Sequence, residues 1–97
     1  METIKQRYHQ WILGQIQVWD GEIVQFREIV NRMEEIGEYY EGSRHLREVE
    51  QRHHELFDKY HDLMLSEESE WDAKRIAVDA AAAKVQDLLE RYLRVFA

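Results

Sequence analysis

The chain has 97 residues, no cysteine, no proline and a formal net charge of −7 at pH 7. This length makes one domain, residues 1–97, near the size at which a single hydrophobic core suffices. The lack of cysteine excludes disulfides and thiolate metal sites, and the acidic balance argues against direct nucleic-acid binding, which needs a basic surface. The first eight residues are polar and charged, and no apolar run approaches the roughly 20 residues that span a bilayer. We therefore expect a soluble, cytoplasmic protein that neither enters a membrane nor binds nucleic acid directly.

The first helical pattern covers about residues 3–40. Its apolar positions alternate in steps of four and three, which is typical of the buried seam of a bundle or coiled coil: Ile12, Ile16, Trp19, Ile23, Phe26, Val30, Met33, Gly37 and Tyr40. A second line widens this face through Trp11, Val18, Ile29 and Ile36. Asp20-Gly21 is also a signal for a β-hairpin turn, but a lone hairpin is marginal in water. We favour one helix, with Gly21 as the place where it can bend.

The second helical pattern covers about residues 44–65, after a break at Tyr39–Gly42. Gly42 suits the left-handed residue that ends a helix, and Ser43 suits the N-cap of the next one. The apolar stripe of this helix also contains a histidine: Leu46, Val49, His53, Leu56, Tyr60 and Leu63, widened by Phe57 and Met64. So short a connection predicts that the first two helices are antiparallel neighbours.

The third helical pattern covers about residues 67–96, with Ser66 or Ser69 as its N-cap. Its stripe consists of Trp71, Val78, Ala82, Val85, Leu89, Tyr92 and Phe96, widened by Ile76, Leu88 and Leu93. The three patterns together predict an all-α protein, a three-helix antiparallel bundle with a long first helix.

Two short motifs carry a resemblance. Tyr39-Tyr40-Glu41-Gly42-Ser43 and, further on, Leu65-Ser66-Glu67-Glu68 resemble the Tyr-Tyr-Gly-Ser and Leu-Ser-Glu-Asp signatures of an uncharacterised bacterial family of short helical proteins. The chain departs from those signatures at Glu41 and Glu68. The resemblance covers about a third of the chain and implies a helical fold but no activity.

The predicted helix lengths do not match. At 1.5 Å per residue the first helix would be about 57 Å long and the second about 33 Å, so a second helix that starts after Gly42 reaches back only to about Asp20. Tyr8, Trp11, Ile12, Leu13 and Ile16 would then lack cover within the chain. An exposed apolar patch of this kind marks an interface. We expect a homodimer whose N-terminal arms pair across a two-fold axis; the alternative is a monomer in which residues 8–19 fold back as a fourth helix. The predicted interface residues are Tyr8, Trp11, Ile12, Leu13, Ile16, Trp19 and Phe96.

Four of the five histidines lie in the second helical pattern, where a set of possible metal ligands occurs: Glu50, His53, His54, Asp58 and His61. Glu50-x-x-His53 has the spacing of helical di-iron carboxylate proteins, but such a site needs further ligands, for example from Glu34 or Glu38. We favour the alternative that His53 is a core histidine with a polar partner and that the others are surface residues. We predict no bound metal or cofactor.

No nucleophile motif, phosphate loop or acid–base pair is present, and we expect no enzymatic activity. The sequence favours a small interaction or adaptor protein that acts through an aromatic and aliphatic helix face. One alternative is an acidic inhibitor, a nucleic-acid-mimicking decoy that binds a cationic protein surface through Glu34, Glu35, Glu38 and Glu41 or Glu67, Glu68, Glu70 and Asp72. The other is a metal-binding protein that uses the histidine and carboxylate set.

Overall fold

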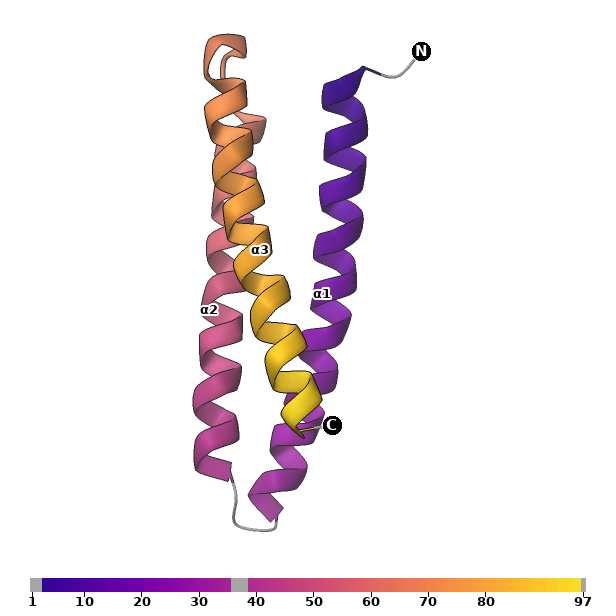
Figure 1. Ribbon diagram of the computed structural model, residues 1–97, viewed down its shortest axis with the longest axis vertical. Helices are drawn as coiled ribbons and strands as arrows, with labels where there is room; N and C mark the ends of the chain where they lie inside the picture. Colours follow the sequence, from indigo (N-terminus) through magenta and orange to yellow (C-terminus); the bar gives the residue numbers. More distant parts are fainter. Residues whose placement is uncertain (1–2, 36–38, 97) are drawn as a thin grey trace.

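The computed structural model describes residues 3–35 and 39–96, and within them the side chains of residues 3–33 and 41–94. Three α-helices, α1 (Ile4–Glu35), α2 (Tyr39–Met64) and α3 (Trp71–Phe96), account for nearly all of these residues, and a 3-10 helix, η1 (Glu68–Glu70), precedes α3. No strand occurs in either range. The helices α1 and α2 are antiparallel, and α3 runs back along α2 and crosses toward the C-terminal half of α1 (Figure 1). The prediction of an all-α, three-helix antiparallel bundle is confirmed.

The helix ends follow local chemistry. α1 begins with a capping box, in which the Gln6 backbone N–H donates to Thr3 Oγ1 (3.1 Å) and the Thr3 N–H donates to Gln6 Oε1 (2.8 Å). At the end of α2 the Ser66 hydroxyl donates to the Leu63 carbonyl at 2.7 Å. The prediction that Ser66 caps α3 is therefore wrong, because this hydroxyl satisfies the C-terminal end of the preceding helix.

The helix α1 continues without a break through Asp20 and Gly21. The hairpin alternative for this segment is wrong, and so is the fold-back of residues 8–19 as a separate helix. A Cβ added to Gly14 or Gly21 would meet no atom within 4 Å. Neither glycine is therefore required by close packing inside the molecule.

The core consists of the stripes that the periodicity predicts. The buried apolar residues are Ile12, Ile16, Trp19, Ile23, Phe26 and Val30 of α1, Val49, Leu56, Tyr60 and Leu63 of α2, and Val78, Ala82, Val85, Leu88, Leu89 and Tyr92 of α3. Ile76, predicted to widen the core face of α3, is exposed instead, because it lies on the opposite side of the helix from Val78 and Val85. The predicted stripe residues Gly37, Tyr40 and Phe96 lie outside the residues whose side chains are described.

The position of the break between α1 and α2 differs from the prediction. α1 ends at Glu35 and α2 already begins at Tyr39, so Gly42 and Ser43 lie inside α2 rather than between helices. Gly42 is buried, and a Cβ there would lie 3.1 Å from Met33 Sδ and 3.3 Å from Val30 Cγ2. This glycine therefore allows α1 and α2 to approach closely; it does not end a helix.

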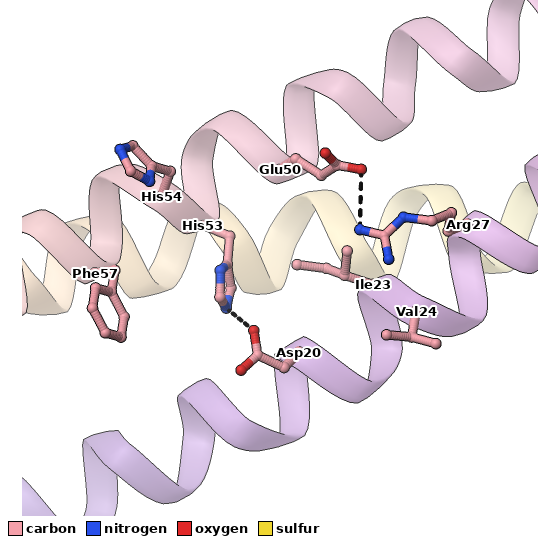
Figure 2. Close-up of a pocket in the computed structure, with 8 residues that line it drawn as sticks. All are labelled: Asp20, Ile23, Val24, Arg27, Glu50, His53, His54 and Phe57. Carbon is pink, nitrogen blue, oxygen red and sulfur yellow. Dashed lines mark hydrogen bonds and ion pairs between the residues drawn. The ribbon is translucent and has the colours of Figure 1, made fainter.

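The earlier break changes which residues of α1 and α2 lie opposite each other. Asp20 lies beside His53 (Figure 2), whereas a break at Gly42 would have placed Asp20 near Leu65, about 12 residues or roughly 18 Å further along α2. Moving the connection by about five residues shortens α1 and lengthens α2 by the same amount. In an antiparallel pair these two changes add, so the pairing shifts by about twice as many residues. α2 and the start of α3 therefore reach the first turns of α1 and cover them.

Candidate functional site

An open groove of about 520 Å³ lies between α1 and α2. Figure 2 shows the side chains that line it: Asp20, Ile23, Val24 and Arg27 of α1, and Glu50, His53, His54 and Phe57 of α2. Charged groups of both signs border a small apolar surface formed by Val24 and Phe57. None of these eight residues is a serine, threonine or cysteine, so the groove lacks a hydroxyl or thiol nucleophile.

Two polar contacts across this groove use residues from the predicted metal-ligand set. His53 Nε2 lies 2.9 Å from Asp20 Oδ1, an ion-pair distance, although the contact lacks the geometry of a directed hydrogen bond. Glu50 Oε1 lies 3.4 Å from Arg27 Nη2. Sequence reasoning missed Asp20 and Arg27 as partners, because it placed other residues of α1 opposite these positions on α2.

The remaining members of the set do not join them. His54 lies 3.5 Å from Asp58 on the outer surface of α2, and the His61 ring lies 4.8 Å from that of Phe57. Over the residues that the structure describes, no three histidine or carboxylate side chains converge in a way that could hold a metal ion. The other proposed ligands, Glu34 and Glu38, lie outside the described side chains. Metal binding by this set stays a prediction.

Five of the seven predicted interface residues divide into a buried group and an exposed group. Ile12 and Ile16 are 0% and 4% exposed, and Trp19 is buried with them. The expectation that Tyr8, Ile12 and Ile16 lack cover within the chain is wrong, because α2 and α3 reach these turns in the observed pairing. Trp11 and Leu13 remain 51% and 42% exposed. The side chain of Phe96 is outside the described part of the chain.

Tyr8 anchors the start of α1 to α3. Its hydroxyl donates to Asp79 Oδ1 at 2.6 Å, and its ring packs edge-on against that of Trp71, with centroids 5.7 Å apart. Asp79 also accepts from Arg75 Nη1 at 2.9 Å. Burial, together with the bond to Asp79, raises the pKa of Tyr8 above its ordinary range. The residue is therefore a structural anchor within one molecule rather than a free interface residue.

Tyr92 makes the equivalent connection near the other end of the bundle. Its hydroxyl donates to Glu48 Oε2 at 2.8 Å, and its ring stacks on His45 with centroids 4.2 Å apart. Burial and the bond to Glu48 raise the pKa of Tyr92. Tyr8 thus connects α1 to α3, and Tyr92 connects α3 to α2.

The outer face of α1, which we define as the exposed residues between Gln10 and Gln25, is unusually poor in charge. All residues of this range are described, and ten are exposed: Gln10, Trp11, Leu13, Gly14, Gln17, Val18, Asp20, Gly21, Val24 and Gln25. Only Asp20 carries a charge, and it pairs with His53. Over the same length of α2, residues 44–59, five of eight exposed residues are charged. The contrast separates this face from an ordinary solvated helix surface.

Apolar side chains lie on both margins of the outer face. Leu13 and Val24 lie toward α2, and Trp11 and Val18 lie toward α3, with Val24 and Val18 49% and 53% exposed. Gly14 and Gly21, two helical turns apart, lie between these margins. The periodicity placed Trp11 and Val18 beside the buried stripe, and the mismatch of helix lengths predicted Trp11 and Leu13 as interface residues. Sequence reasoning missed Val18, Val24 and the two glycines as parts of an exposed face. The sequence did contain a signal for this face. Asp20 and Glu22 are the only charged residues between positions 8 and 25, although 34% of the whole chain is charged.

The second predicted acidic cluster is partly neutralised within the molecule. Glu68 lies 3.4 Å from Lys5, and Glu70 lies 3.0 Å from Lys74. The side chains of Glu34, Glu35 and Glu38 in the first cluster are not among those described. These contacts give the acidic-inhibitor alternative no additional support.

Comparisons of the chain with protein-family models, with curated proteins and with solved structures found no match. The resemblance to the bacterial family with Tyr-Tyr-Gly-Ser and Leu-Ser-Glu-Asp signatures stays a prediction. In the ranges that the structure describes, no helix has the length and apolar character needed to cross a membrane.

Proposed function

We propose that this protein is a non-enzymatic helical interaction protein that binds a helix of another polypeptide on the outer face of α1. The observation that carries the proposal is the combination of low charge with half-exposed apolar side chains along one helix. Interfaces are depleted of charged residues at their centres and use aromatic anchors. The half-exposed indole of Trp11 fits that description.

The shape of the face favours a helical ligand. It follows one straight element over about 22 Å between Gln10 and Gln25, and the two glycines in its middle present bare backbone. Small residues let another helix approach closely, while the flanking apolar side chains pack on either side of it. The stability of the fold gives no alternative reason for these glycines, because each costs about 1 kcal/mol relative to alanine inside a helix and neither is crowded.

The proposed function is that of the predicted adaptor protein, with a binding surface that differs in part from the predicted one. The predicted interface residues Ile12, Ile16 and Trp19 are buried in the core. The proposed binding surface therefore keeps the predicted residues Trp11 and Leu13 and adds Val18 and Val24. Burying these side chains would yield about 25 cal/mol for each Å² of apolar surface removed from water.

Photo-crosslinking in living cells that express the full chain tests the proposal. A photoreactive amino acid replaces Val18 on the outer face or, as the matched control, Gln51 on the exposed surface of α2. We expect discrete protein adducts at position 18 and few at position 51. Equal labelling at both positions, or none at position 18, would contradict the proposed function.

A further inference from the structure

We infer that the helix bound by the outer face of α1 is α1 of a second copy of this chain, in antiparallel orientation about a two-fold axis near Val18. This inference rests on the proposed function and names its partner. It is carried by the pattern of residues along the face, which is complementary to itself when the direction is reversed.

The self-complementary pattern appears when two copies of α1 are aligned antiparallel about an axis that passes between Gln17 and Val18, which brings the two Val18 side chains next to each other. Gly14 of one copy then lies opposite Gly21 of the other, so bare backbone meets bare backbone at two symmetric points. A two-fold axis of this kind brings the same margin of each helix together. Leu13 therefore meets Val24 of the second copy on the margin toward α2, within the reach of one helical turn.

The ends of the contact are complementary in charge. The same alignment places the exposed Arg7 of one copy opposite the exposed Glu28 of the other, and the symmetric pair repeats at the far end. Opposite charges at the rim of an interface favour encounter and fix the register. A parallel arrangement would instead place Arg7 near Arg7 and Glu28 near Glu28, which is unfavourable.

The net charge of the chain restricts where two copies can meet. Each chain carries a formal charge of −7, so copies that approach through charged surfaces repel one another. The outer face of α1, between Gln10 and Gln25, exposes a single charged residue, Asp20. Two copies can therefore meet there with one charged residue from each copy in the contact. That carboxylate already pairs with His53 in its own chain.

The predicted contact is small, because it uses one helix from each copy. It belongs with weak or transient interfaces, below about 1,200 Å² of total buried surface. We therefore expect association that depends on concentration rather than a permanent dimer.

Single cysteines test the arrangement, because the chain has none of its own. In the full chain, Val18→Cys would place two thiols within disulfide distance across the axis. Gln25→Cys, on the same face of the same helix, would place them about 22 Å apart. At micromolar protein we expect Val18→Cys to form the linked dimer at least about tenfold faster, because association raises the effective concentration of the two thiols. Gln10→Cys mixed with Gln25→Cys should give the mixed dimer in preference to either homodimer.

A charge exchange adds a readout that a non-specific collision would not change. Arg7→Glu and Glu28→Arg should each slow the crosslinking of Val18→Cys, and the double variant should restore it. Equal crosslinking rates at positions 18 and 25, or no restoration in the double variant, would overturn the antiparallel pairing. Photo-crosslinking at position 18 in cells separates the failure of this inference from the failure of the proposed function. If the photoreactive residue labels only proteins other than this chain, a second copy is excluded while the proposed function stands. If it labels no protein, the proposed function itself fails.

Discussion

The pairing of α1 with α2 makes a strong prediction about two neighbouring residues, Ile12 and Leu13. Ile12 is fully buried, whereas Leu13 is 42% exposed. Replacing Ile12 by alanine removes three buried carbon atoms, at about 0.8 kcal/mol each, and leaves part of a cavity. We expect a loss of about 3 kcal/mol in the free energy of unfolding. Leu13→Ala, one residue along the same helix, should cost less than about 1 kcal/mol because much of its side chain is already in water.

Thermal and urea unfolding, followed by far-UV circular dichroism, measure both variants. For a domain of this size, 1 kcal/mol shifts Tm by about 4–8 °C, so Ile12→Ala should melt roughly 12–24 °C below the wild type. The difference between the variants should persist at protein concentrations tenfold apart, because α2 and α3 of the same chain cover Ile12. If Ile12→Ala and Leu13→Ala lose stability equally, or if the loss from Ile12→Ala depends on concentration, the observed pairing is refuted.

Two further predictions concern residues at opposite ends of the bundle. Tyr8→Phe removes the hydrogen bond to Asp79 and should cost about 1 kcal/mol at neutral pH. Because the pKa of Tyr8 is raised in the folded state, wild-type stability should be intact below about pH 10 and fall as the pH rises further; melts between pH 8 and 11 should show a shallower fall for the variant, and an identical slope would contradict this account. Gly42→Leu should destabilise the fold by about 1–3 kcal/mol through crowding against Met33 and Val30. The control Gly21→Ala should instead stabilise it by up to about 1 kcal/mol, and urea midpoints in the reverse order would exclude close packing at Gly42.

The sequence alone determined that the chain forms three helices and where the central buried stripe of each helix lies. Phe26, Val49 and Val85 all lie on predicted stripes and are buried. Periodicity predicts them well because it is local: a helix turns by about 100° per residue whatever it packs against. The histidine set shows the limit of this reasoning. Spacing along α2 placed Glu50 and His53 near each other, but their actual partners, Arg27 and Asp20, come from α1.

Only the tertiary structure decided how α1 and α2 pair. Gly42 and Ser43 have the local chemistry of a helix end, yet a glycine costs only about 1 kcal/mol inside a helix, less than the packing of several apolar side chains yields. α2 therefore begins at Tyr39, and Gly42 packs against α1. Because the connection sets the pairing of every residue beyond it, this small local change covers Ile12 and Ile16 and leaves Trp11, Val18 and the two glycines of α1 facing the solvent.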